Sequence, residues 1–210
     1  MDTELCDDPS LREDHARLEK CKQFFSHLTA EELPSFIPNI LELLFDRWSV
    51  IRSECGKLLS KIPNAYNEEL CYVLIKQAQS AGTWQEVHGA IIGLSALITV
   101  AKHEDCRLVL NEIIALCVER IGNVNISIKE ASRSCLINIQ RKVEHKSMLV
   151  ERIFLSVESI VSQPNSDTEA CALKLDGLLG CLVDNYQMYP ELVPQEVESS
   201  SSNIGVVGTL

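Results

Sequence analysis

The sequence predicts an all-α fold, an α-solenoid of about four stacked helical hairpins, on three observations. Helical hydrophobic periodicity fills residues 8–188, and no stretch alternates with the period of a β-strand. Aromatic residues make up only 5% of the chain although 46% of it is hydrophobic, so the core must consist of aliphatic side chains and cysteines, which suits packed helices. Turn-forming residues recur at an even spacing, around positions 29–34, 63–64, 81–83, 122–123 and 163–165.

The chain is expected to open with a disordered acidic segment, residues 1–7, and a capping helix over about Pro9–His27. One side of this predicted helix is apolar and the other is charged. A repeat at the end of a stack has no neighbour on its outer side and therefore needs a polar face there. The apolar side carries Leu11, Leu18, Cys21, Phe25 and Leu28.

Four helices share one pattern when Arg52, His88, Lys129 and Glu169 are aligned, at successive spacings of 36, 41 and 40 residues. The residues one before and three, six and ten after this column lie within one narrow arc of a helix, so each copy is predicted to bury the same face. The position six after the column reads Leu58, Leu94, Cys135 and Leu175. In the fourth copy the other three positions are Thr168, Ala172 and Leu179.

Each of these inner helices is preceded by an amphipathic outer helix, predicted over residues 34–45, 67–80, 107–121 and 147–162. Pro34 stands in the first turn of the first outer helix, where the missing amide hydrogen costs nothing. Ser166 and Glu169 have the spacing of a capping box, which predicts the start of the fourth inner helix.

The segment Leu33–Leu59, LPSFIPNILELLFDRWSVIRSECGKLL, resembles a HEAT repeat, the armadillo-type helical repeat. Its prolines open the outer helix, Asp46 ends that helix, and Arg52 follows six residues later. The resemblance implies a ladder in which Asp46 and Arg52 tie adjacent repeats together. Residues 83–98 are similar to repeats of very long HEAT solenoids, and the resemblance as a whole covers about residues 30–185.

The net charge of −11 opposes sequence-independent binding of nucleic acid, because an acidic protein repels phosphate groups. Nine cysteines contain no closely spaced pair of the kind that holds structural zinc, so no metal site is predicted. With no apolar leader near Met1, a reducing compartment is expected, the cytoplasm or the nucleus. The longest apolar run, residues 90–101, is too short to span a bilayer, so no membrane insertion is expected.

No catalytic residue and no cofactor are predicted. His103 and Cys106 are close in sequence, but no nucleophile signature surrounds them, and cysteines at apolar helical positions behave as small hydrophobic residues. No glycine-rich phosphate loop occurs, since Gly89 and Gly93 fall inside a predicted helix. The protein is therefore expected not to be an enzyme.

Candidate partner-binding residues lie on the arc opposite the shared buried face, which in HEAT solenoids forms the concave side. Gly89, Gly93 and Ala96 give the second inner helix a face without polar groups, which favours either close packing of a neighbouring helix or contact with a partner. Trp48 and Trp84 each precede the aligned column by four residues, where an aromatic ring serves either as a plug of the hairpin end or as a hot spot.

Lys57, Arg133, Arg141 and Lys174 add positive charge to the same arc and suggest a groove for an acidic protein segment, the alternative being ordinary solvated surface. The expected function is a non-enzymatic scaffold or adaptor that binds proteins along the solenoid. Two other functions remain open: a repeat protein that binds nucleic acid through this local basic groove, and a non-catalytic regulatory subunit of an enzyme complex. Residues 189–210, polar and serine-rich, are expected to be a disordered tail.

Overall fold

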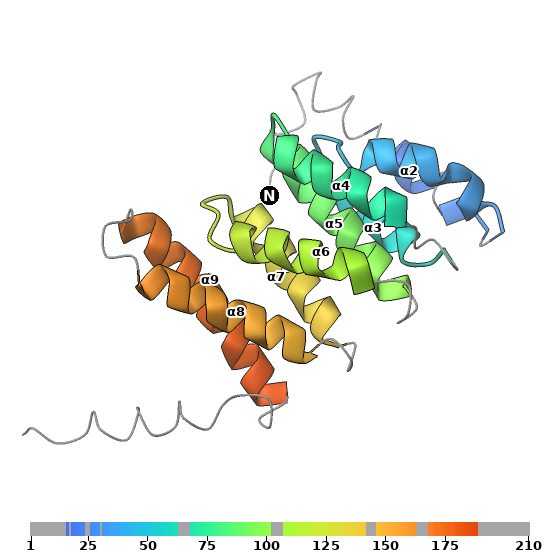
Figure 1. The fold of residues 1–210 in the computed structure, drawn as a ribbon. Coiled ribbons are helices and arrows are strands. Elements are labelled where there is room, and N and C mark those ends of the chain that lie inside the picture. The colour runs from blue at the N-terminus through green and yellow to red at the C-terminus, as the bar shows by residue number, and fades with distance from the viewer. Residues whose placement is uncertain are drawn as a thin grey trace, which may run out of the picture. The chain divides into compact units, whose positions relative to one another are not determined.

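A computed structural model of the chain contains only helices among its described elements, which confirms the all-α fold class (Figure 1). The described residues are 16, 18–23, 26–29, 31–62, 68–101, 107–141, 146–162 and 168–188. Residues 1–7, the tail 189–210 and the capping-box residue Ser166 lie outside them, so the expectations for these segments stay predictions. The described parts of the predicted capping helix, residues 16, 18–23 and 26–27, are helical.

The predicted outer and inner helices alternate along the chain. The outer helices are a 3₁₀ turn η2 (Leu33–Phe36) continued by α2 (Ile37–Leu43), α4 (Glu68–Ser80), α6 (Arg107–Arg120) and α8 (Lys146–Val161). The inner helices are α3 (Ser49–Leu59), α5 (Trp84–Val100), α7 (Ile126–Gln140) and α9 (Thr168–Met188).

Side-chain caps fix where two of the inner helices begin. Thr83 and Glu86 form a capping box at the start of α5, in which each side chain accepts a hydrogen bond from the backbone amide of the other residue. At the start of α7 the Asn125 side chain accepts a hydrogen bond of 2.9 Å from the amide of Ser127. These caps satisfy amide groups that the first helical turn leaves without partners.

The chain divides into two compact units, residues 1–113 and 114–210, and α6 crosses the division. In the first unit α2 packs on α3, α4 packs on α5, and the two inner helices α3 and α5 pack on each other. A Cβ atom at Gly56 of α3 would overlap the Ile92 side chain of α5, so the small residue allows this close approach. In the second unit α9 packs on both α7 and α8, and α7 also packs on α8.

The shared apolar face is buried in the first three inner helices, as the sequence predicts. The position six residues after the aligned column, occupied by Leu58, Leu94 and Cys135, is buried in each. So are the positions one before and three and ten after the column, which are Ile51, Cys55, Ile62, Val87, Ile91, Ile98, Ile128, Ser132 and Ile139.

The prediction for the fourth inner helix is wrong at three of the four positions. Thr168 and Ala172 are exposed, Leu179 is 50% exposed, and only Leu175 is half-buried. Over residues 168–183, where side-chain burial is described, the buried residues of α9 are Gly177, Leu178 and Cys181. The physical reason is that α9 is the last described helix, so no described hairpin follows it to cover the predicted face.

Candidate functional site

A buried hydrogen-bond cluster joins α3 to α5 in the first unit. Arg52 has no exposed surface, and its Nε donates a hydrogen bond of 2.9 Å to Nδ1 of His88. Its Nη1 donates to the backbone carbonyl oxygens of Asp46 and Arg47, which follow the end of α2. Arg52 therefore links the turn between α2 and α3 to helix α5.

Arg52 does contact Asp46, but through the backbone oxygen of Asp46 and within the α2–α3 segment, so this contact is not the link between adjacent repeats that the resemblance implied. The Asp46 carboxylate accepts a hydrogen bond of 2.9 Å from the amide of Trp48, and this fixes the turn between α2 and α3. The connection to the next inner helix runs from Arg52 to His88, the next residue in the aligned column.

His88 is held as a neutral ring. It is 8% exposed, and burial, reinforced by the positive charge of Arg52, lowers the pKa of His88 to about 4. A neutral imidazole can accept the Arg52 hydrogen bond at Nδ1 only if its proton is on Nε2. The single contact with Arg52 therefore fixes the protonation of both ring nitrogens: Nδ1 accepts a hydrogen bond and Nε2 carries the proton.

Trp84 covers the same cluster from the first turn of α5. The guanidinium carbon of Arg52 lies 5.0 Å from the centre of the Trp84 ring, a cation–π distance, and the Trp84 and His88 rings meet edge to face at 6.3 Å. The guanidinium carbon of Arg47 lies 5.8 Å from the centre of the Trp48 ring, and Trp48 is half-buried. Trp84 remains 40% exposed, so the two roles predicted for the tryptophans, a plug of the hairpin end and a partner-binding hot spot, both stay open.

The second unit contains a corresponding contact between its inner helices. Nζ of Lys129 in α7 donates to the Asp176 carboxylate of α9 at 2.7 Å. This interaction lowers the pKa of Asp176. Lys129 stands where Arg52 does in the aligned column, so in each unit a cation reaches from one inner helix to the next.

Two further features recur with this contact. Asp46 in the first unit and Asn123 in the second each accept, through their side chain, the amide of the residue two positions on. A glycine beside the acceptor in the next inner helix makes room for the preceding turn: a Cβ on Gly89 would overlap the Leu44 carbonyl oxygen, and one on Gly177 would lie 2.8 Å from that of Ile121. The two units thus share one local construction.

The correspondence changes the contact residue expected in the fourth copy. Arg52 and His88 are 36 residues apart, whereas Lys129 and Asp176 are 47 apart, so the residue equivalent to His88 is Asp176 and not Glu169. Asp176 thus takes the place in this contact that Glu169 was expected to have, while the residues one before and three and six after it, Leu175, Leu179 and Leu182, are not buried either.

Gly89, Gly93 and Ala96 are not on a binding surface. All three are buried, and a Cβ on Gly93 would lie 2.8 Å from Leu44 and 3.0 Å from Leu74. The small size of Gly89 and Gly93 serves packing against Leu44, directly after α2, and against Leu74 of α4, which is the other alternative that the sequence offered. The predicted use of these three residues in partner binding is wrong.

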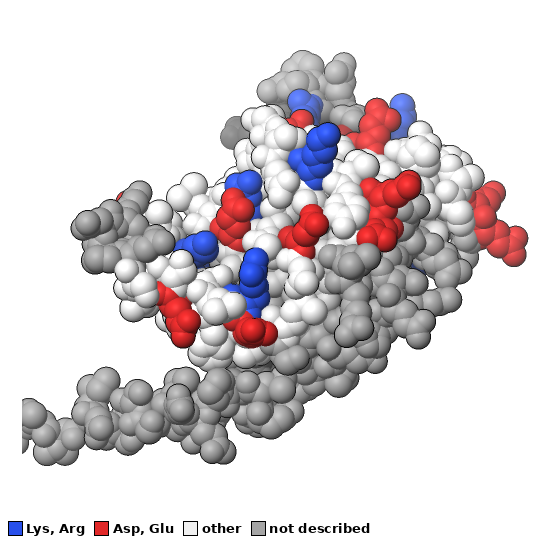
Figure 2. Space-filling view, viewed as in Figure 1, with Lys and Arg blue, Asp and Glu red and all other residues white. Residues whose placement is uncertain are grey.

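The predicted basic residues have separate surroundings. Lys57 is exposed and pairs with Glu54 on the same helix, at 2.7 Å. Arg133 lies beside α9, since a Cβ on Gly180 would come 4.0 Å from its guanidinium carbon, and Arg141 is exposed. On the face drawn in Figure 2, the basic and acidic side chains of the described residues are interspersed and form no continuous basic area.

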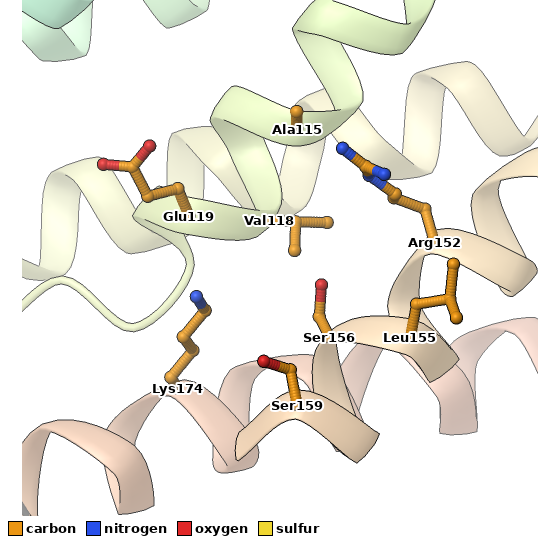
Figure 3. A pocket seen from close by; sticks show the side chains of 8 residues that line it. All are labelled: Ala115, Val118, Glu119, Arg152, Leu155, Ser156, Ser159 and Lys174. Carbon is orange, nitrogen blue, oxygen red and sulfur yellow. The ribbon is translucent and has the colours of Figure 1, made fainter. Parts of the chain in front are cut away.

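Lys174 does line a pocket, in the second unit. The pocket has a volume of about 240 Å³ and lies between the outer helices α6 and α8, with Lys174 contributed by α9 (Figure 3). A Cβ on Gly122 would come 2.7 Å from the Cα of Lys174, so the backbone at Lys174 sits tightly against the turn after α6. The other lining residues are Ala115, Val118, Glu119, Arg152, Leu155, Ser156 and Ser159.

These residues, apart from Lys174, were not among the sequence candidates, because binding was expected on the inner helices alone. The available signal was the spacing of Arg152, Leu155, Ser156 and Ser159, which places a cation, a leucine and two hydroxyl groups on one face of an outer helix. The core residues of α8, Leu149, Val150 and Ile153, account for the burial of that helix without them.

Two of the buried cysteines, Cys55 and Cys117, have a raised pKa, which opposes formation of a reactive thiolate. Burial raises the pKa of Cys55 to about 12. The hydrogen bond with Cys135 and burial raise the pKa of Cys117 well above its usual value. Within the described ranges no three His, Cys, Asp or Glu side chains are placed to hold a metal ion, and no described helix is long and apolar enough to cross a membrane.

No protein-family model matches this chain, and no curated protein is significantly similar to it.

Proposed function

We propose that this chain is a HEAT-like helical-repeat scaffold that binds proteins along its surface and catalyses no reaction. The observation that carries the proposal is the construction found in both units: a turn closed by Asp46 or Asn123, a cation that reaches the next inner helix, and a glycine beneath the turn. Repetition of one local construction is what a stack of similar hairpins requires.

The repeat construction supports a binding role because stacked hairpins offer extended surfaces for shape-matched contact. The state of the chemistry-bearing residues also supports it. His88 is buried and already engaged with Arg52, and burial of Cys55 opposes formation of the thiolate that a nucleophile needs. His88 and Cys55 thus both serve the packing of the core.

The test is purification of the tagged full chain from its native cells after mild chemical cross-linking, followed by mass spectrometry. We expect one or more proteins in stoichiometric amount that remain with the chain through gel filtration. A matched sample from cells expressing only the tag is the control. The proposal fails if the chain elutes alone, or if a variant of a single Cys or His abolishes a measured turnover.

A further inference from the structure

We propose that the pocket between α6 and α8 binds an acidic segment of a partner protein, with its carboxylates held by Arg152 and Lys174 and a neighbouring aliphatic side chain placed on Leu155. This inference rests on the proposed scaffold function and assigns to it a site and a partner chemistry.

The pocket is built from two matching helix faces. Arg152, Leu155, Ser156 and Ser159 recur at the spacing of one face of α8, and the side chains of Arg152 and Ser156 point toward α6 (Figure 3). Lys174 enters from α9 at the edge, held in place by the close packing of its backbone on Gly122. Three helices of one unit thus fix the pocket before any ligand arrives, which lowers the entropic cost of binding.

The charges in the pocket favour an anion. Neither Arg152 nor Lys174 has a hydrogen bond or ion pair with any described residue, so both cations are available to a ligand. Glu119 also lines the pocket; its side chain is 62% exposed and lies 3.8 Å from Arg120, so the lining carries two positive charges and one negative charge. Arginine presents a planar fork of donors that matches a carboxylate, and the hydroxyl groups of Ser156 and Ser159 add two further donors.

The apolar part of the pocket selects a peptide over a nucleic acid. Leu155 is 50% exposed, and with Val118 it gives the pocket an aliphatic wall. Proteins that bind single strands stack bases on aromatic rings, and none of the described residues that line this pocket is aromatic. The chain's net charge of −11 also repels a polyphosphate, whereas a short segment with one or two carboxylates needs only the local cations.

The size of the pocket agrees with side chains rather than a free small molecule. Its volume of about 240 Å³ is below the roughly 300–1,000 Å³ of typical ligand pockets. A glutamate with an adjacent leucine or valine would fill it while the peptide backbone stays at the surface.

The experiment measures fluorescence anisotropy of a short labelled peptide of repeated Glu-Glu-Leu triplets with the purified full chain. A peptide of the same length with Gln in place of Glu is the control ligand. We expect the Glu peptide to bind and the Gln peptide not to bind. Arg152→Glu should weaken binding by about tenfold or more, since it both removes a cation and adds a repelling charge.

Lys76→Glu is the matched control variant, because it makes the same change of charge at an exposed cation of α4, outside the pocket lining and outside the candidate binding residues. Leu155→Ser should weaken binding without altering charge. Arg152 and Leu155 are exposed, so both variants should keep the helical circular dichroism of the wild type.

The proposal is overturned if both peptides bind equally, if Arg152→Glu leaves the affinity unchanged, or if a labelled single-stranded RNA binds in an Arg152-dependent manner and the peptide does not. If the peptide fails while a stoichiometric protein still co-purifies with the chain, the pocket assignment falls and the scaffold function stands. If no protein co-purifies, the scaffold function falls whatever the peptide does.

Discussion

At the scale of single residues, His88 couples the stability of the first unit to pH. Its pKa is about 4 in the folded chain and near its ordinary value of 6.5 when unfolded. Below pH 6.5 the unfolded chain takes up a proton that the folded chain excludes, so the stabilising contribution is complete above pH 6.5 and is lost as pH falls toward 4.

We therefore expect the free energy of unfolding of the first unit to fall by about 2–3 kcal/mol over that interval because of His88. His88→Gln keeps an acceptor for Arg52 and cannot titrate, so it should remove most of this slope. Urea denaturation followed by tryptophan fluorescence at several pH values measures the effect. His27→Gln, at an exposed histidine, is the matched control and should retain the wild-type slope.

The thiols give a second test at this scale. Cys55, Cys71, Cys117, Cys135 and Cys181 are buried, whereas Cys21 and Cys171 are half-buried. Since maleimides react with accessible thiolates, we expect native labelling read by mass spectrometry to modify Cys21 and Cys171 well before the five buried cysteines. All seven should react in denaturant. Rapid labelling of Cys55 in the folded chain would contradict the packing described for α3.

At the scale of elements, the glycines decide how closely a turn approaches the next inner helix. A methyl group at Gly89 would overlap the backbone carbonyl of Leu44, and backbone cannot move aside as a flexible side chain can. We expect Gly89→Ala to destabilise the first unit by about 2–3 kcal/mol through overpacking, measured by urea denaturation.

Gly82→Ala is the control for this substitution. No atom lies within 4 Å of the added methyl group at Gly82, so its effect should stay within about 0.5 kcal/mol. Equal losses in the two variants would indicate that the cost comes from glycine removal in general and not from the approach of Leu44.

Prediction of the buried face from the sequence succeeded for three inner helices and failed for the fourth. Three inner helices bury the predicted face because the apolar spacing of one helix directly determines which side meets the core, as Leu58, Leu94 and Cys135 show. In the fourth, the contact expected at Glu169 is made by Asp176, seven residues later. A shift of seven residues turns a helix face by only about 20°, so hydrophobic periodicity alone could not detect it.

The candidate site was harder to predict than the fold. Whether Gly93 packs or binds depends on what lies opposite, and here that is Leu44 and Leu74, which come from earlier helices. The pocket depends on α6 and α8 meeting face to face with Lys174 at the edge, a three-helix arrangement that no local pattern encodes. Lys174 was proposed from its position on α9, while Arg152 was missed because it belongs to an outer helix.

At the scale of the whole molecule, tryptophan fluorescence reports on the unfolding of the first unit alone. Its two tryptophans, Trp48 and Trp84, both lie in the first unit, whereas helices in both units contribute to far-ultraviolet circular dichroism. Because each unit is compact by itself, we expect Gly89→Ala to lower the fluorescence midpoint in urea more than the midpoint of circular dichroism.

The complementary variant is Gly177→Ala, which crowds Ile121 in the second unit. It should lower the dichroism midpoint and leave the fluorescence midpoint near that of the wild type. Identical shifts of both signals in both variants would show that the chain unfolds in one all-or-none step.

The two inter-helix contacts differ in the nature of their partners, and this has a consequence for handling the protein. Arg52 and His88 form a wholly interior bond between a cation and an uncharged ring, while Lys129 and Asp176 are opposite charges whose side chains are 20% and 72% accessible to water. Dissolved ions screen the second kind of interaction and hardly reach the first. A concentrated salt buffer therefore loosens the α7–α9 contact while leaving the α3–α5 contact as it was.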